Sequence, residues 1–497
     1  MSKIDTQEGN QFSKSKKYIR KKRHPYKLYI PENLDMDAIL SENPPDFKYQ
    51  RDNFIYIVHL ISSIPTWKKD FDIVKYRGFT PVHKLYLSSR IHNYRPYIDY
   101  LKQQGVVIEG TSYMPGHYAC GLKFTERYRT KVKGCYITKN TLIKSIMESS
   151  HNRDIEAEKR LPFLKDWFNS NLTIDMEAVK SYLDGEAEKE KADMFEMKRL
   201  GKVKKDSSLS IDELATHRYN MRLIPADKIN DGRGYRLKID NTSGRFHSPL
   251  TNLKKELKQY LKHNGETLYG IDIVNSQPLL SLVVLDYDLF IKNGIYKIIA
   301  HYNEKFKGLA EYPELSDTSH SLSTMLVELI KDCHKAADVQ IFRKSVIEGS
   351  FYEQFANLLK ENFLLPEDVL GDRIKERKYA KRAIFTAFFS KQKSVIWNKE
   401  IQAFKQCFPT VFEIFNLIKS GKGNHATLAL LLQRVESNLV LHNICYDINK
   451  AYPESPLFTI HDSIASTSEN IFNFRNIFER HLFEKLGEVP KLMVEKW

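Results

Sequence analysis

The pattern of hydrophobic and polar residues divides this chain into regions with different expected structures. Within residues 51–138, apolar side chains recur first at helical spacing and then at the alternating spacing of strands. Gly105 is a suitable C-terminal cap for the last of the helices. The expected elements are helices at 54–64, 82–90 and 94–103 and strands at 106–108 and 121–124, which is the outline of a winged helix.

The third of these helices carries basic and polar residues at its N-terminal end, the part of a recognition helix that reaches DNA base edges. We therefore expect this domain to bind duplex DNA. The alternative is a domain that mediates only protein contacts. The residues concerned are Arg90, His92, Asn93, Tyr94 and Arg95.

The two flanking regions are polar. Residues 1–50 are expected to form a basic flexible arm, because a cluster of Lys and Arg between residues 14 and 23 precedes a Pro-rich stretch. This cluster is either a phosphate clamp or a solvated tail. Residues 139–230 are expected to form a helical linker or thumb, because mixed charges, notably at 186–205, are typical of a solvated helix face.

Two carboxylates in residues 231–497 lie in unusual places. Asp272 interrupts the apolar strand 268–274, and a lone carboxylate there is costly unless it is paired or binds a cation. Asp462 lies within the apolar stretch 457–464, which is typical of a tight hairpin with the aspartate at its tip. Brought together, the two could hold a pair of Mg²⁺ ions. Separately, each would more often be a turn or capping residue.

Two cations and two aromatic residues recur every four positions between residues 377 and 389. These residues are Arg377, Lys381, Phe385 and Phe389, and four-residue steps place them on one stripe of a helix. Cations suit a triphosphate and aromatic faces suit a base. Taken alone, the pattern would indicate a basic amphipathic helix with a Phe-lined core face.

Composition narrows the class of protein. The 497 residues carry a formal charge of +15, and such an excess of Lys and Arg most often neutralises phosphate backbones. No apolar run is long enough for a membrane span, so we expect an intracellular protein. The cysteines have no zinc-ligand spacing and indicate a reducing compartment; they are Cys120, Cys135, Cys333, Cys407 and Cys445.

In their order along the chain, the segments at 272–277, 377–390 and 461–463 resemble motifs A, B and C of the A family of DNA polymerases and the related single-subunit RNA polymerases. The segment 243–246 with Asn252-Leu253 resembles the Thr-Gly-Arg-Leu segment that precedes motif A in the family, and 408–411 and Gln433 are weaker matches. The resemblance covers about residues 230–497. It implies an α+β fold in which the winged helix precedes a right-hand polymerase core with helical thumb and fingers and an antiparallel palm sheet.

The resemblance also implies a role for each matching residue. Asp272 and Asp462 would be the metal carboxylates for two Mg²⁺ ions, with the Ile273 carbonyl as a further ligand. Arg377 and Lys381 would hold the triphosphate, and Lys381 would protonate the leaving pyrophosphate.

The aromatic residues of motif B would pack on the incoming nucleotide and the templating base, and Gln277 would lie beneath the sugar. The residues implied near the primer and template are Arg245, Asn252, Gln433 and His461.

Three positions depart from the family pattern. Ser463 replaces the usual Glu of motif C in DNA polymerases, Gln277 replaces the Glu that helps to exclude ribose, and Phe389-Ser390 replaces Tyr-Gly. The choice between deoxyribose and ribose therefore stays open. Asp286 and Asp288 are expected to have surface or capping roles rather than to form a metal site.

The implied function is that of a DNA-directed DNA polymerase that replicates a phage or mobile element in the cytoplasm of a bacterial or infected cell. Its expected partners are a DNA template, a primer and deoxynucleoside triphosphates, and a monomer is expected. No proofreading is expected, because residues 1–230 lack the pattern of an exonuclease. The alternatives are a single-subunit RNA polymerase and a non-catalytic DNA-binding replication initiator or regulator.

Overall fold

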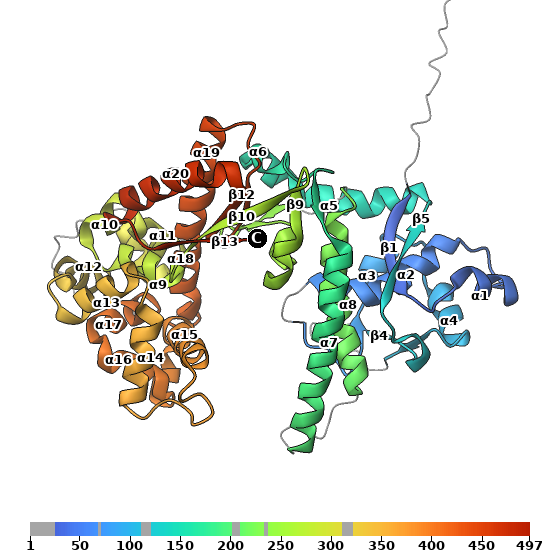
Figure 1. The fold of residues 1–497 in the computed structure, drawn as a ribbon, viewed down its shortest axis with the longest axis horizontal. Helices are drawn as coiled ribbons and strands as arrows, with labels where there is room; N and C mark the ends of the chain where they lie inside the picture. Colours follow the sequence, from blue (N-terminus) through green and yellow to red (C-terminus); the bar gives the residue numbers. More distant parts are fainter. Residues whose placement is uncertain (1–24, 68–70, 111–120, 201–208, 233–236, 311–321) are drawn as a thin grey trace, which may run out of the picture. The chain divides into compact units, whose positions relative to one another are not determined.

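The structure is a computed structural model that describes residues 25–67, 71–110, 121–200, 209–232, 237–310 and 322–497 (Figure 1). The chain forms two compact units, one comprising residues 1–65 and 72–147 and the other residues 66–71 and 148–497. Both contain helices and strands. Within the described ranges, no helix is both long enough and apolar enough to cross a membrane.

The first unit packs helices against two small antiparallel sheets. Helix α2 is buried along almost its whole length and forms the centre of the unit, where Phe54 contacts the rings of Tyr97 and Tyr100. One sheet pairs β1 with β5, and the other has the strand order β2-β4-β3. The elements are β1 (Tyr26–Pro31), α1 (Met36–Glu42), α2 (Arg51–Ser63), β2 (Thr80–Pro81), α3 (Lys84–Ser88), α4 (Arg95–Gln103), β3 (Val107–Glu109), β4 (Gly121–Phe124) and β5 (Val132–Ile137).

The three helices and the β3–β4 pair expected between residues 54 and 124 are present, with boundaries shifted by a few residues. The expected flexible arm is wrong for residues 26–42, because β1 pairs with β5 and Leu28, Ile30 and Leu40 are buried. The sequence suggested an arm because prolines lie at both ends of β1 and because its partner strand, β5, lies about a hundred residues away. The basic cluster between residues 14 and 23 lies outside the described residues.

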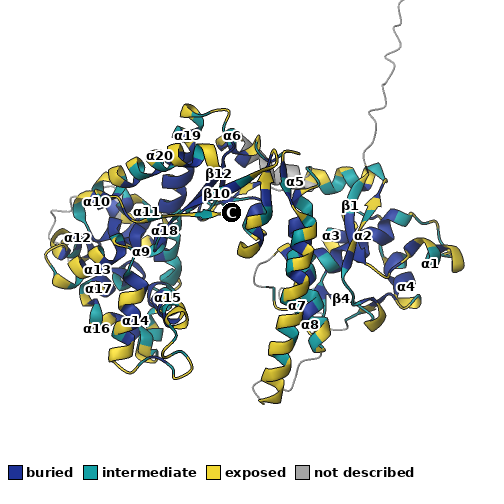
Figure 2. Ribbon diagram, in the orientation of Figure 1, coloured by how far each residue is buried: buried dark blue, intermediate teal, exposed yellow. Residues whose placement is uncertain are grey.

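The second unit contains an antiparallel sheet flanked by helices. Its strand order is β11-β12-β10-β9-β6, with β13 also paired to β10. In Figure 2 the residues of β10 and β12 are mostly buried, whereas the C-terminal part of helix α7 (Met176–Arg199) is exposed. The strands are β6 (Leu172–Ile174), β9 (Leu261–His263), β10 (Glu266–Ile273), β11 (Phe458–Ile460), β12 (Ser463–Thr467) and β13 (Leu492–Lys496), and a separate pair is β7 (Lys238–Ile239) and β8 (Phe246–His247).

Most of the unit's mass is helical. The main helices before residue 350 are α5 (Asn140–Arg160), α6 (Pro162–Lys165), α7 (Met176–Arg199), α8 (Ile211–Ile229), α9 (Ser276–Leu280), α10 (Tyr287–Lys292), α11 (Ile295–Tyr302), α12 (Leu322–Cys333) and α13 (Ala337–Ile347). Those after it are α14 (Phe351–Glu361), α15 (Arg373–Phe389), α16 (Lys399–Cys407), α17 (Pro409–Ile418), α18 (Thr427–Ser437), α19 (Cys445–Ala451) and α20 (Ser468–Leu486).

The boundary expected at residue 230 differs from the structure. Strand β6 of the expected linker pairs with β9 and so belongs to the same sheet as β10. Helices α7 and α8 pack against one another, and the long charged helix at 186–205 is observed as α7 up to Arg199. Its last expected residues lie outside the described ranges. Because a three-residue strand carries little periodicity, its pairing was not visible in the sequence.

Strand β10 has a glycine at position 270 because a larger residue would not fit there. A Cβ atom at Gly270 would lie 2.3 Å from Nε1 of Trp497, which is buried against the sheet. The indole therefore packs directly on the strand that carries Asp272. The Lys258 ammonium lies 4.4 Å from the centre of this indole.

Candidate active site

Of the two aspartates singled out in the sequence, Asp272 lies on β10, and Asp462 lies in the turn just before the neighbouring strand β12. Strand β10 pairs with β12 so that Asp272 is directly opposite Ser463, and Asp462 is the residue immediately before Ser463. Strands β11 and β12 form the expected hairpin, in which His461 and Asp462 are the two turn residues. The tertiary pairing thus brings Asp272 and Asp462 together although they are far apart in the sequence.

Backbone strain accompanies this turn. His461 has a φ of 57°, in the left-handed region that non-glycine residues seldom adopt. Its ring lies 6.1 Å from that of His247, in an edge-to-face arrangement. Such strained conformations cluster at functional sites, where the surrounding structure holds them.

The positive charges near Asp272 are too weak to offset its burial and the negative charges around it. Burial, together with repulsion from Asp462 and Glu495, raises the pKa of Asp272 to about 7. Glu495 pairs with Gly270 across β10 and β13, so it is on the same face of the sheet as Asp272. Lys255 and Lys258 oppose the shift, but burial lowers the pKa of Lys258 itself.

Helix α15 carries the cationic and aromatic stripe, and its two cations lie beside the buried ring of Tyr352. The charge of Asp462 also acts on this tyrosine. The Arg377 guanidinium lies 5.3 Å and the Lys381 ammonium 5.6 Å from the centre of this ring. Burial raises the pKa of Tyr352, Asp462 raises it further, and Arg377 lowers it. Arg377 also donates a 2.5 Å hydrogen bond to Glu353.

The aromatic half of the stripe is only partly buried. The rings of Phe385 and Phe389 are 5.5 Å apart, and the adjacent Phe388 points into the core instead. The buried Lys419 ammonium donates a 3.0 Å hydrogen bond to the Ala387 carbonyl at the end of α15. This bond fixes the last turn of the helix, where Phe389 lies.

A buried carboxylate on α18 joins two other predicted site residues. Glu436 is 1% exposed and accepts two hydrogen bonds of 2.8 Å from the Arg245 guanidinium. It also accepts a 2.6 Å hydrogen bond from the Gln277 amide. Burial and repulsion from Asp462 raise the pKa of Glu436 to about 7, although Arg245 opposes the shift.

Sequence reasoning missed Glu436 and chose Gln433, three residues earlier on the same helix. The side chain of Gln433 is half-buried, and it is Glu436 that bonds Arg245. Tyr352, Lys258 and Glu495 were missed as well. An acidic residue within an apolar helical run was the one available signal for Glu436, since a buried carboxylate requires a partner.

The residues that follow Asp272 include polar atoms without partners. Asn275 is 5% exposed and has a φ of 57°, and within the described part of the chain its Oδ1 and Nδ2 atoms make no hydrogen bond. The Ser276 hydroxyl is buried and equally unsatisfied among the described residues. Unpaired buried polar groups of this kind require an explanation, and a bound polar ligand would supply one.

The remaining predicted residues occupy less informative positions. Asn252 is exposed at the end of a short 3₁₀ helix (Pro249–Asn252), and Ile273 is the last residue of β10. Asp286 is the N-cap of α10, where it accepts a hydrogen bond from the Leu289 amide, which confirms the expected capping role. In the first unit, Arg95 bonds both Asp99 and Glu109, so neighbouring carboxylates already neutralise its charge.

Comparison with known proteins gives a distant likeness to solved structures. No family model and no curated protein matches this chain. Among solved structures it is similar to the POL domain of Pol1 from M. smegmatis in complex with DNA primer-template and dNTP, with a TM-score of 0.38 and 12% sequence identity. The similarity covers 72% of this chain and 73% of that one. A likeness of this size leaves the functional argument to the residues themselves.

Proposed function

We propose that this chain is a template-directed nucleotidyltransferase, and specifically a DNA-directed DNA polymerase without proofreading that serves a phage or mobile element. The observation that carries the proposal is the pairing of β10 with the β11–β12 hairpin, which brings Asp272 beside Asp462. The cationic stripe of α15 approaches the same place through Tyr352. In this arrangement the carboxylates could hold metal ions at the α-phosphate of a nucleoside triphosphate, and the cations could bind its other phosphates.

The carboxylate pair fits divalent cations. Two half-buried aspartates that repel one another, followed by the unsatisfied Asn275 amide, lack the positive charge that Mg²⁺ would bring. Asp272 and Asp462 would hold the ions, with the Ile273 carbonyl as a further ligand. When bound, such ions activate an attacking hydroxyl and neutralise a leaving pyrophosphate. Among the described residues, no set of three or more His, Cys, Asp or Glu side chains is grouped as a metal site, so the proposal rests on the pair.

The chain's own residues would do the rest of the work. Arg377 and Lys381 would bind the phosphates, and Lys381 would donate a proton to the leaving pyrophosphate. Arg377 must exchange its bond with Glu353 for the triphosphate, which a doubly charged phosphate favours. Phe385 and Phe389 would stack on the nucleotide and the templating base.

Gln277 would contact the sugar and Arg245 the minor groove, both from the side opposite α15. Hydrogen bonds to Glu436 hold the two side chains in place. Asn252, Gln433 and His461 would lie along the primer and template. Because Gln277 is already bonded to Glu436, it would form a fixed floor beneath the sugar. We propose a preference for deoxynucleotides that is weaker than in a polymerase with Glu at this position.

The first unit would supply duplex binding as a winged helix. What supports this is the order of its elements, in which three helices precede the antiparallel β3–β4 pair, and the β2-β4-β3 sheet. The contacts of Arg95 with Asp99 and Glu109 exclude it from this role in its present position. His92 and Asn93, both exposed before α4, are the better candidates for base contacts.

A primer-extension assay with Mg²⁺ and separate dNTP and NTP pools tests the proposal. Asp272→Asn and Asp462→Asn should each reduce extension by at least about a thousandfold while DNA binding persists. The matched control is Asp288→Asn, an exposed aspartate that should leave extension unchanged. DNA binding without any extension by the wild type would instead favour a replication initiator. The observation that supports this second candidate is the order of helices and strands in the first unit. Extension from NTPs alone would favour an RNA polymerase.

A further inference from the structure

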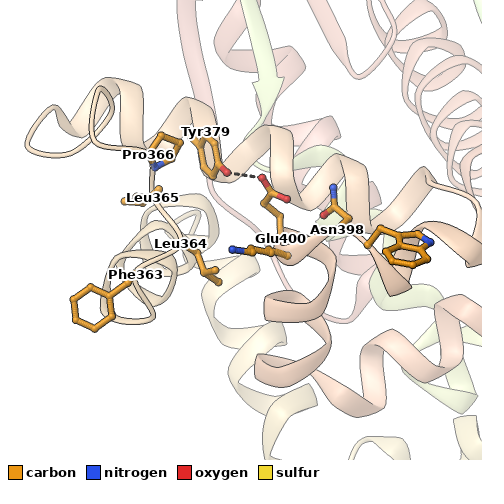
Figure 3. Close-up of a pocket in the computed structure, with 9 residues that line it drawn as sticks. Phe363, Leu364, Leu365, Pro366, Tyr379, Asn398 and Glu400 are labelled. Carbon is orange, nitrogen blue, oxygen red and sulfur yellow. Dashed lines mark hydrogen bonds between the residues drawn. The ribbon is translucent and has the colours of Figure 1, made fainter.

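Two fully exposed aromatic side chains lie at the rim of one pocket. Phe363 is 94% exposed and Trp397 86% exposed, the two highest values among the exposed large apolar side chains of the described residues. Both line a pocket of about 380 Å³ whose other walls include Leu365, Tyr379 and Lys399. Figure 3 shows the Phe363 ring projecting away from the helices that carry the pocket. Two such rings beside one pocket offer apolar faces against which a flat ligand can stack.

The backbone that presents these rings is held in place. Phe363 has a φ of 55°, a left-handed conformation that costs a bulky residue about 1 to 2 kcal/mol. Gln402 donates hydrogen bonds to the carbonyls of Val395 and Ile396, immediately before Trp397. The floor of the pocket is fixed as well, because the Tyr379 hydroxyl donates a 2.5 Å hydrogen bond to Glu400. An aromatic side chain has only two rotatable bonds, so it loses little entropy when a ligand stacks on it.

The surrounding charge is positive. Residues 372–400 contain nine Lys and Arg and three acidic residues. Of the acidic residues, Glu376 is buried and bonded to Lys360, and Glu400, which lines the pocket, accepts a hydrogen bond from Tyr379. Arg382 lies 4.9 Å from the centre of the Tyr379 ring, and Lys399 lines the pocket. Tyr379 comes two residues after Arg377, so this surface is on the other side of α15 from the cations of the candidate active site.

We propose that Phe363 and Trp397 form a stacking surface for the unpaired bases of single-stranded DNA, with Lys399 and Arg382 neutralising its backbone. Single-stranded nucleic acid is the ligand that combines flat apolar faces with regularly spaced negative charge. Duplex DNA keeps its base faces covered. This surface is distinct from the proposed catalytic carboxylates, and binding to it requires neither metal nor nucleotide.

The test is binding of a fluorescein-labelled oligothymidylate of about 16 nucleotides to the full chain in EDTA at about 100 mM NaCl. Phe363→Ala combined with Trp397→Ala should weaken binding about ten- to hundredfold. The matched control combines Phe472→Ala and Phe483→Ala, two exposed phenylalanines on α20, and should bind as the wild type does. The Asp272→Asn protein should also bind normally, which separates this proposal from the polymerase proposal.

Two further measurements locate the contact. An oligonucleotide containing 5-iodouracil should crosslink to Phe363 or Trp397, because the photoproduct forms with a stacked ring. Phe363→Gly removes the ring and relieves the positive φ, so it should weaken binding while keeping or raising Tm, which a merely structural residue would not do. Wild-type affinity in the double variant, or crosslinks confined to other residues, would overturn the proposal and indicate a protein partner for this apolar surface.

Discussion

Glu436 accepts two hydrogen bonds of 2.8 Å from the guanidinium of Arg245, a residue 191 positions earlier in the chain. The same carboxylate bonds Gln277 at 2.6 Å and is repelled by Asp462. It therefore couples three segments of the candidate site through one buried side chain. Two neighbours strengthen the connection, because Ser437 donates a hydrogen bond to the Ser243 carbonyl and Arg434 donates one to the Asn241 carbonyl.

Replacing Glu436 should disturb both the fold and the candidate site, because its carboxylate bonds Arg245 and Gln277. Glu436→Ala leaves a largely buried Arg245 without a partner, and we expect the free energy of unfolding to fall by about 3 kcal/mol. Glu436→Gln should cost less stability, keep the bond to Arg245 in weakened form, and lower discrimination between dATP and ATP because Gln277 is no longer fixed. Denaturant unfolding and kcat/KM for the two nucleotides measure these effects. Gln433→Ala is the control, and an equal loss there would contradict the role of Glu436.

The raised pKa values of Asp272 and Glu436 predict how stability depends on pH in the absence of metal. A carboxyl group whose pKa is higher in the folded than in the unfolded state stabilises the fold below about pH 4, and this stabilisation is lost as pH rises through about 7. Asp272→Asn removes that loss and should make the metal-free protein more stable than wild type at about pH 8, by on the order of 2 kcal/mol. Thermal unfolding at about pH 5 and pH 8 measures it.

His217 changes the stability with pH in the opposite direction, and it is present in both variant and wild type, so their difference isolates Asp272. Burial lowers the pKa of His217 to about 4, so its neutral form favours folding as pH rises towards 6.5. Adding Mg²⁺ at pH 8 should raise the Tm of the wild type and have little effect on Asp272→Asn. A variant no more stable than wild type at pH 8 would show that the Asp272 carboxylate is not under electrostatic stress.

Lys381 is expected to contribute to the chemical step more than to DNA binding. Lys381→Ala should lower the single-turnover rate by about a hundredfold or more, because a proton donor acts mainly in the transition state, while the affinity for primed DNA changes little. Lys375→Ala, an exposed lysine in the first turn of the same helix, is the control. Equal losses of rate and affinity at Lys381 would mean that it only tethers phosphate.

Phe389 bears on the choice of sugar. In the single-subunit RNA polymerases that the sequence resembles, a Tyr hydroxyl at the position of Phe389 helps to select ribose. Phe389→Tyr should therefore shift the ATP to dATP ratio of kcat/KM towards ATP by about two- to tenfold, the value of one hydrogen bond. Phe385→Tyr, one turn earlier, should not. An unchanged ratio for Phe389→Tyr would show that the sugar is sensed elsewhere, and a wild type that clearly prefers ATP would favour RNA synthesis.

The local elements of this protein follow from its sequence. The strand around Asp272, the hairpin that presents Asp462 and the helix carrying Arg377 to Phe389 were predictable, because side-chain periodicity and turn chemistry act over a few residues. The helices and the β3–β4 pair of the first unit were predictable for the same reason. The Asp286 cap could be expected because an N-cap depends only on its own turn.

Only the tertiary structure decided which distant segments meet. The pairing of β1 with β5, the addition of β6 to the main sheet, and the contacts of Glu436, Tyr352 and Glu495 depend on packing that no local pattern encodes. Buried charges are the clearest case, because a carboxylate such as Glu436 needs a partner, but its sequence neighbours do not say which. Long-range contacts are chosen by the total burial and charge pairing of the folded chain, and so they become visible only once the chain has folded.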